Sequence, residues 1–306
     1  MKTISIVIPV FNEELSIQSN LNVILNALPI LENVPFEILV INDGSADQTE
    51  TQVRDFTTKD SRIKLISFTR NFGKEAAIVA GLTASRGQAV IVMDSDLQHP
   101  PELIGSMITY WQKGFMVVEG IKENRGQESH LSRWCAEGFY FFLKKLSGFS
   151  LSGHSDFKLL DREVVDAYLS LPEKQRFFRG LVTWLGHISV QIPFSVAERS
   201  GGGSSRWSQM KLFRYALKNI AIFSSAPLSF VSGLGIVTLL FGFVFAIVSL
   251  WQKYEGHALT GFTTVNLLII IIGGSILFCL GIVGHYLALI YDEIKGRPQY
   301  ILKKKE

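Results

Sequence analysis

Asp94 and Asp96 have the spacing of a metal site. They directly follow the apolar run 89–93, and Gln98 stands two positions further on. Two carboxylates spaced i, i+2 at the end of a strand suit a hard divalent cation, which takes oxygen ligands and can in turn hold phosphate oxygens. An Asp-x-Asp pair is also common in ordinary turns. Its position after a buried strand, with acidic clusters after the neighbouring strands, favours the metal site.

The elements that position these aspartates alternate between two kinds. Apolar runs rich in β-branched residues are separated by helix-like segments. This alternation predicts an α/β fold with a doubly wound, mostly parallel sheet, in which ligands bind beyond the carboxyl ends of the strands. The predicted strands are 4–10, 36–41, 63–68 and 89–93, and the predicted helices are 13–28, 74–85 and 101–113. The polar clusters that follow the strands, which we expect to form one site, are Asn12-Glu13, Asn42-Asp43-Gly44-Ser45, Arg70-Asn71 and Asp94-Ser95-Asp96.

The polar residues after the first two strands have an alternative interpretation as helix caps. Asn12 could cap the first helix, and Ser45 or Asp47 the second. A free helix N-terminus also favours phosphate, so capping and ligand binding can coexist. The carboxylates of Glu13 and Asp43 suit a base or a ribose better than a phosphate, which they would repel.

Composition and charge argue against several classes of protein. The net charge of +3 is too small to indicate a nucleic-acid partner. Cys135 and Cys279 are too few and too far apart for a disulfide framework or a zinc site. The first apolar run is too short for a signal peptide, so we expect the globular part to stay on the side where it is made.

Two long apolar segments, 226–251 and 265–291, lie in the last quarter of the chain. Each can cross ~30 Å of hydrocarbon as a helix. Basic residues flank the pair and are scarce in its connecting loop, so the positive-inside rule predicts a two-helix membrane hairpin with both termini cytoplasmic. The basic residues are Arg206, Lys211, Arg214 and Lys218 before the pair, Lys253 in the loop, and Lys295, Arg297, Lys303, Lys304 and Lys305 after the pair.

The segment 206–224 predicts an amphipathic helix in the membrane interface. Its apolar residues can share one face, and Lys211, Arg214 and Lys218 share the other. A core helix of the globular part is the alternative, which the adjacent membrane span disfavours. The Gly/Ser-rich stretch 200–205 predicts a flexible link. The predicted parts are a globular domain (1–205), the interface helix (206–224), the membrane hairpin (225–291) and a basic cytoplasmic tail (292–306).

The motifs and their order resemble glycosyltransferase family 2. Within that family the chain is most similar to the polyprenyl-phosphate glycosyltransferases, the group of dolichol-phosphate mannose synthase and bactoprenol glucosyl transferase. The resemblance covers nearly the whole chain and implies a GT-A fold for the globular domain. The residues that carry it are Val7-Ile8-Pro9-Val10-Phe11-Asn12-Glu13, Asn42-Asp43-Gly44-Ser45, Arg70-Asn71-Phe72-Gly73-Lys74-Glu75, Asp94-Ser95-Asp96-Leu97-Gln98-His99-Pro100, Ser155-Asp156-Phe157-Lys158-Leu159-Leu160-Asp161-Arg162, Arg176-Phe177-Phe178-Arg179-Gly180 and Tyr291-Asp292-Glu293-Ile294-Lys295-Gly296-Arg297-Pro298.

The resemblance also implies roles for single residues. Asp156 is the implied catalytic carboxylate, and Mg²⁺ or Mn²⁺ is the implied cofactor. The implied donor-binding residues are Pro9, Phe11, Glu13 and Asp43 for the uridine, Arg206 for the diphosphate, and Lys74 and Asp94 for the donor in general. The implied metal ligands are Asp94, Asp96 and Gln98, and the implied contacts of the acceptor phosphate are Arg133, Lys122 and Arg125.

The implied reaction is the inverting, metal-dependent transfer of a hexose, with glucose favoured, from a UDP-sugar to undecaprenyl or another polyprenyl phosphate. It would take place on the cytoplasmic face of a bacterial inner membrane and supply a lipid-linked sugar for surface-glycan modification, such as that of O-antigen. A flippase and a second glycosyltransferase are the implied partners, and small residues around Gly273-Gly274-Ser275 would permit close helix packing in a homo-oligomer. UDP-N-acetylglucosamine or another UDP-hexose is an open alternative donor, and a catalytically silent membrane scaffold with a nucleotide-binding fold is the rival from another class.

A phosphate acceptor changes what Asp156 must do. The second pKa of a phosphate monoester is ~6, so most of the acceptor is already a dianion at pH 7. Asp156 then either orients groups or accepts the proton of the minor monoanion. Two histidines depart from the pattern of the resemblance. His99 is either a third-shell neighbour of the metal or a turn residue, and we favour the turn residue. We interpret His285 as a packing or snorkelling residue of the second membrane helix.

Overall fold

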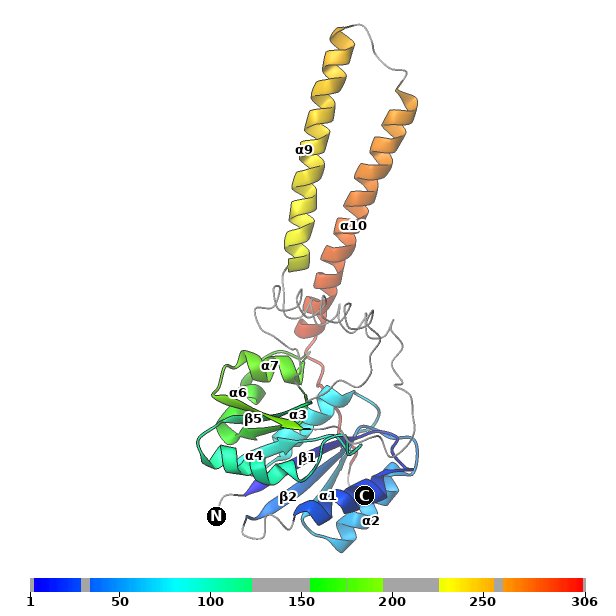
Figure 1. Ribbon diagram of the computed structural model, residues 1–306. Helices are drawn as coiled ribbons and strands as arrows, with labels where there is room; N and C mark the ends of the chain where they lie inside the picture. The colour runs from blue at the N-terminus through cyan, green and yellow to red at the C-terminus, as the bar shows by residue number, and fades with distance from the viewer. Residues whose placement is uncertain are drawn as a thin grey trace. The chain divides into compact units, whose positions relative to one another are not determined.

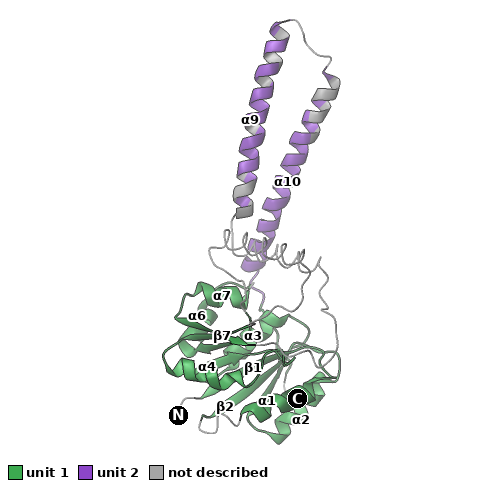
Figure 2. Ribbon diagram, viewed as in Figure 1, with its two compact units in different colours: residues 1–207, 298–306 green, residues 208–297 purple. Residues whose placement is uncertain are grey.

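The protein divides into two compact units in a computed structural model (Figure 2). One unit contains residues 1–207 and 298–306, and the other contains residues 208–297. The residues that the structure describes are 3–28, 34–122, 155–174, 176–194, 226–255 and 261–304. The predicted interface helix, 206–224, lies outside them.

A seven-stranded sheet forms the centre of the first unit (Figure 1), in the order β3-β2-β1-β4-β6-β5-β7. The first four strands are parallel, β6 runs antiparallel to both β4 and β5, and β7 is parallel to β5. The predicted mostly parallel α/β sheet is therefore confirmed. The strands are β1 (Ile4–Val10), β2 (Phe36–Asn42), β3 (Ile63–Ser67), β4 (Ala89–Val92), β5 (Val117–Lys122), β6 (Lys158–Asp161) and β7 (Ser189–Phe194).

Helices cover both faces of this sheet, because the central strands are apolar on both faces. Ile6 and Ile8 of β1 share a core with Ile17 and with other residues of α1 and α4. Successive side chains of a strand point to opposite faces, and Val7 meets α3 at Gly81, where a Cβ atom would lie 2.2 Å from the Val7 side chain. The described helices of this unit are α1 (Ile17–Ala27), α2 (Thr49–Lys59), α3 (Lys74–Ala84), α4 (Leu103–Gln112), α6 (Arg162–Ser170) and α7 (Phe178–Trp184).

The C-terminal residues return to the first unit and extend the sheet at β3, its edge strand. The N–H of Lys303 donates to the carbonyl of Ser67 (2.8 Å), and the N–H of Thr69 donates to the carbonyl of Ile301 (3.0 Å). The ring of Tyr300 stacks on Phe68 with centroids 5.0 Å apart. This pairing covers the exposed hydrogen-bonding groups of an edge strand, which otherwise invite association with other chains.

The second unit contains two long helices, α9 (Ala226–Tyr254) and α10 (Phe262–Ile294), which contact each other. Many of their described apolar side chains are exposed, among them Phe243 and Leu277. In the described part of the chain one helical stretch, Ile271–Ile294, is long and apolar enough to cross a membrane, by length and composition alone. Both predicted membrane segments lie on helices, but a second membrane-crossing helix is not confirmed.

The turn after β2 depends on a glycine. Gly44 has a φ of +65°, which residues other than glycine rarely adopt. A Cβ atom at this position would lie 2.2 Å from the carbonyl carbon of Arg70. The two strand-end loops therefore approach each other backbone to backbone at this position.

Gly44→Ala is expected to lower the Tm of the detergent-solubilised protein by ~4–8 °C more than Gly186→Ala. Gly186 has a φ of +69°, and a Cβ there would meet only the Trp184 carbonyl oxygen, at 3.9 Å, so both variants share the backbone cost of ~1–2 kcal/mol. The clash with Arg70 adds ~2 kcal/mol in Gly44→Ala alone. Equal Tm values for the two variants would show that the loops do not meet in this way.

Candidate active site at the carboxyl ends of the parallel strands

Asp43, which directly follows β2, fixes the start of α3. The residue is 3% exposed, and its carboxylate accepts hydrogen bonds from the N–H groups of Phe72 (2.7 Å) and Gly73 (2.9 Å). Burial raises the pKa of Asp43 above its usual range, and the two N–H donors oppose that shift. Since α3 begins at the next residue, Lys74, Asp43 determines where the Lys74 side chain starts. A contact of Asp43 with uridine stays a prediction.

The residues after β1 and β2 hold each other, and Asn12 is not a helix cap as one interpretation had it. The helix α1 begins at Ile17, and Asn12 has a φ of +52° and bridges to the second loop. Its N–H donates to Ser45 Oγ, and its side-chain oxygen accepts from the N–H of Ala46, both at 3.0 Å. The capping interpretation failed because a partner 34 residues away, the N–H of Ala46, competes for the Asn12 side chain. Phe11, in the same loop, is 43% exposed.

Asp156 lies at the centre of a network of ion pairs. Its carboxylate accepts hydrogen bonds from Arg179 Nε (2.6 Å) and Nη2 (2.9 Å) and from Lys74 Nζ (2.6 Å). The same Lys74 ammonium is 2.6 Å from Asp94 Oδ1. One lysine thus joins Asp94, a predicted metal ligand that follows β4, to the predicted catalytic carboxylate.

The network determines the charge of its members. Burial of Asp156, which is 6% exposed, would raise the pKa of its carboxyl, but Arg179 and Lys74 outweigh burial and hold that pKa well below its usual range. Burial would likewise lower the pKa of the Lys74 ammonium, and the carboxylates of Asp156 and Asp94 instead raise it. Asp156 therefore stays ionised and is a poor proton acceptor at neutral pH.

Glu75 adjoins this network and holds a proton near neutral pH. Its carboxyl accepts a hydrogen bond from the N–H of Phe178 (2.9 Å). Burial and the neighbouring charge of Asp156 raise the pKa of Glu75 to about 7, against the opposing effects of that N–H, Lys74 and Arg179. The charges of Asp94 and Asp156 are already balanced by those of Lys74 and Arg179. An ionised Glu75 would add a negative charge that no further cation of this network compensates.

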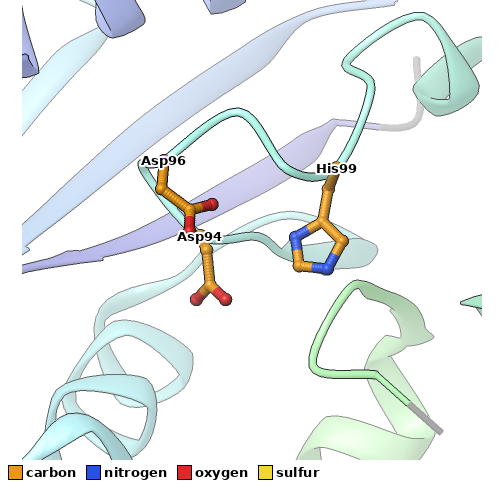
Figure 3. Close-up of side chains that lie close together, drawn as sticks. All are labelled: Asp94, Asp96 and His99. Carbon is orange, nitrogen blue, oxygen red and sulfur yellow. The ribbon is translucent and has the colours of Figure 1, made fainter. Parts of the chain in front are cut away.

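Asp94 and Asp96 lie with His99 in a cluster that suits a divalent metal (Figure 3). One ligand atom from each of the three residues lies within 4.8 Å of the other two. The interpretation of His99 as a mere turn residue is therefore incomplete, since its ring is buried beside the two aspartates. The two carboxylates are suitable ligands for Mg²⁺ or Mn²⁺, and the imidazole places a nitrogen beside them. Gln98 follows in the same turn, and its N–H donates to Asp96 Oδ1 (3.1 Å).

The buried ion pair between Glu119 and Lys158 holds the segment that carries Asp156. Glu119 of β5 pairs with Lys158, which lies opposite it on β6, and also accepts a hydrogen bond from the N–H of Ser155 (2.9 Å). Burial lowers the pKa of Lys158, and Glu119 opposes that shift. Because a buried charge without its partner is costly, the pair holds the 155–158 segment in one register.

The predicted site residues fall into three groups. Pro9, Phe11, Glu13, Asp43, Lys74, Asp94, Asp96, Gln98 and Asp156 all lie in the described part of the chain, and Lys74 joins Asp94 to Asp156. Arg206, Arg133 and Arg125 lie outside it, and of Lys122 only the backbone, at the end of β5, is described. Sequence reasoning included Arg179 and Glu75 in motifs of the resemblance but gave neither of them a role in the site. The signal for Arg179 was a charged residue among the aromatic and apolar residues of 177–182.

Comparison with known proteins identifies relatives along the whole chain. A family model described as "Glycosyl transferase family 2" matches residues 5–169. The "SfII prophage-derived bactoprenol glucosyl transferase" of Shigella flexneri is 36% identical over 98% of this chain and 97% of its own length. The "Uncharacterized glycosyltransferase YkcC" of Bacillus subtilis is 36% identical over 98% of this chain and 93% of its own.

Among solved structures, one described as "Crystal Structure of a Mycobacterial Protein" has a TM-score of 0.50. It is 22% identical to this chain and covers 72% of it, with 73% of that structure matched. At this identity the likeness concerns the fold alone.

Glu75→Gln is expected to stabilise the protein at pH 8 and to change its stability little at pH 5. The folded pKa of about 7 exceeds the ordinary value of 4.5, so wild-type stability falls as pH rises through this window, by up to ~3 kcal/mol. Glutamine keeps an acceptor for the Phe178 N–H without the charge. Thermal unfolding at both pH values measures the difference. Glu50→Gln, which removes the pairs with Arg54 and Lys303, should show no gain at pH 8, and a pH-independent effect of Glu75→Gln would contradict the assignment.

Proposed function

The chain belongs to glycosyl transferase family 2, and we propose that it transfers a hexose, with glucose favoured, from a UDP-sugar to undecaprenyl or another polyprenyl phosphate. That it is a glycosyltransferase follows from the family and from its full-length relatives. The lipid acceptor and the sugar are proposed here because relatives similar over 98% of this chain are named bactoprenol glucosyl transferases.

The observation that carries the proposal is the link that Lys74 makes between Asp94 and Asp156, at 2.6 Å to each carboxylate. A transferase of this kind must hold an anionic donor and an anionic acceptor within bonding distance of each other. The linked network supplies cationic side chains next to a cluster of metal-ligand type. A GT-A-like sheet presents both at the carboxyl ends of its parallel strands, where such sheets bind ligands.

On the donor side, Asp94, Asp96 and Gln98 would hold Mg²⁺ or Mn²⁺, and Pro9, Phe11, Glu13 and Asp43 would hold the uridine. The metal, when bound, supplies positive charge for the diphosphate that leaves. The carboxylates of Asp94 and Asp96 would repel that diphosphate by themselves, so their position in the site suits a metal-dependent donor. Lys74 and Arg206 would add charge on the same side.

On the acceptor side, a lipid-phosphate oxygen attacks the anomeric carbon directly. The new carbon–oxygen bond forms as the bond to the UDP oxygen breaks, so the configuration inverts and UDP leaves. The acceptor is already mostly dianionic at pH 7, and Asp156 is held ionised by Arg179 and Lys74. We assign Asp156 an orienting role toward these two cations, with Arg133, Lys122 and Arg125 as contacts of the acceptor phosphate.

The second unit would bring the site to its acceptor at the membrane. A polyprenyl chain leaves the bilayer at a cost of ~0.8 kcal/mol per CH₂, so the enzyme must work at the membrane surface. The exposed apolar side chains of α9 and α10 would face lipid, and segment 206–224 would lie in the interface. We propose a multi-pass location in a bacterial inner membrane with both termini cytoplasmic, as a homo-oligomer whose product a flippase and a second glycosyltransferase use for surface glycans such as O-antigen.

In detergent with Mn²⁺ or Mg²⁺, the full chain is expected to convert polyprenyl phosphate and one radiolabelled UDP-sugar into an organic-extractable product. UDP-glucose is the expected donor, and label from UDP-N-acetylglucosamine instead would change the sugar alone. EDTA and Asp96→Ala should each lower the rate at least ~10²-fold, because the leaving diphosphate loses its stabilising charge.

The control variant is Asp166→Ala, which removes an exposed carboxylate on α6 and should keep the rate. UDP-sugar binding with no lipid product from any donor would instead favour a silent scaffold or another acceptor.

Asp156→Asn is expected to lower kcat by less than ~10²-fold and to leave the shape of the pH–rate profile unchanged from pH 6 to 8. Loss of a true general base typically costs ~10²–10⁴-fold, whereas an orienting group that stays ionised has no titration in this range. The assay is the same lipid transfer, with UDP affinity of the variant measured in parallel. A residual rate near background across this pH range would refute the orienting role.

A further inference from the structure

We infer that His99 is a further protein ligand of the divalent metal, beside Asp94, Asp96 and Gln98, and that it shifts the preference of the site toward Mn²⁺ and away from Mg²⁺. The inference rests on the metal-dependent function proposed above and extends its ligand set from oxygen donors to a nitrogen donor. It starts from the cluster in which one ligand atom each of Asp94, Asp96 and His99 lies within 4.8 Å of the others. Figure 3 shows the imidazole turned toward the two carboxylates.

The chain builds this cluster with a constrained turn. Leu97 has a φ of +57°, a conformation that a branched apolar side chain rarely adopts, and the N–H of Gln98 donates to Asp96 Oδ1. Pro100 follows His99 and restricts the His99 backbone to extended conformations. Backbone strain of this kind persists only where the surroundings over-determine it, and here its effect is to bring His99 back beside Asp94 and Asp96.

Aromatic rings fix the orientation of the imidazole. The His99 ring stacks on Phe157 with centroids 5.1 Å apart and meets the edge of Phe194 at 5.6 Å, and the residue is 4% exposed. A purely apolar role between two phenylalanines would suit another phenylalanine better, because a buried imidazole must satisfy its polar nitrogens. The two phenylalanine rings therefore hold the imidazole in one orientation, with one of its edges toward the carboxylates of Asp94 and Asp96.

The charge of the cluster favours an uncharged side chain as the further ligand. Asp94 Oδ1 already pairs with Lys74, so two carboxylates and one ammonium meet there. A third carboxylate would add repulsion against an incoming diphosphate, whereas an imidazole adds a ligand atom without negative charge. Mg²⁺ strongly prefers an all-oxygen shell, while Mn²⁺, as a transition-metal ion, accepts an imidazole nitrogen more readily than Mg²⁺ does. A nitrogen in the first shell should thus raise the affinity for Mn²⁺ relative to Mg²⁺.

The experiment uses the full chain in detergent with UDP and measures Mn²⁺ binding by electron paramagnetic resonance, with Mg²⁺ as competitor. In the wild type we expect electron spin echo modulation from a directly bound imidazole nitrogen. His99→Phe keeps an aromatic ring between Phe157 and Phe194 but removes the nitrogen. It should abolish the modulation and weaken Mn²⁺ binding ~10-fold or more, with less than ~3-fold change for Mg²⁺.

Two further variants separate ligation from structure. His99→Asp offers oxygen in place of nitrogen and should retain metal while shifting the Mn²⁺/Mg²⁺ affinity ratio ~10-fold toward Mg²⁺. His187→Gln removes an imidazole between α7 and β7 and should change neither the modulation nor the ratio.

Absence of nitrogen modulation in the wild type, or an unchanged Mn²⁺/Mg²⁺ ratio in His99→Phe, would overturn the inference and leave His99 a structural residue. Failure of the wild type to bind Mn²⁺ at all, even with UDP, would overturn it together with the metal-dependent mechanism. Nitrogen coupling without any transfer of sugar to lipid would overturn the proposed function alone.

Discussion

Burial of the Asp156 carboxylate is the interaction on which the rest of the site depends. An ionised group in a protein interior is stable only where other charges compensate it. Arg179 at the start of α7 and Lys74 at the start of α3 provide that compensation, and Lys74 extends it to Asp94 after β4. Elements that are far apart in the sequence are thereby held at one point. The positions of α3 and α7 are consequences of this charge balance as much as of apolar packing.

Further residues hold the members of this network in place from two sides. Asp43 fixes the N-terminus of α3 through two backbone N–H groups, and Gly44 lets the Arg70 loop approach closely enough for those bonds to form. On the other side, Glu119 and Lys158 hold the segment that carries Asp156. Polar residues after the strands are thus of two kinds, those that face the site and those that hold its loops in place.

Much of the sheet could be predicted from the sequence, because β1, β2 and β4 are buried on both faces and appear as apolar runs. Asp94 and Asp96 were predictable for the same reason, since they directly follow such a run. The insertion of β6 between β4 and β5 was not predictable, because it depends on antiparallel pairing with strands distant in the sequence. The contacts of Arg179 and His99 in the site were not predictable for a related reason, because their partners are set by tertiary packing. Asn12 shows the converse, a local capping rule that a distant partner overrides.

The pairing of the C-terminal residues with β3 has a consequence for the order of folding. The edge of the sheet is completed by residues 300–303, which a ribosome makes only after α9 and α10. Domains usually fold as units from the N-terminal side during synthesis, yet this unit keeps an open strand edge until the helix pair has been made. The seven-stranded sheet can therefore gain its last edge pairing only after both α9 and α10 have been synthesised.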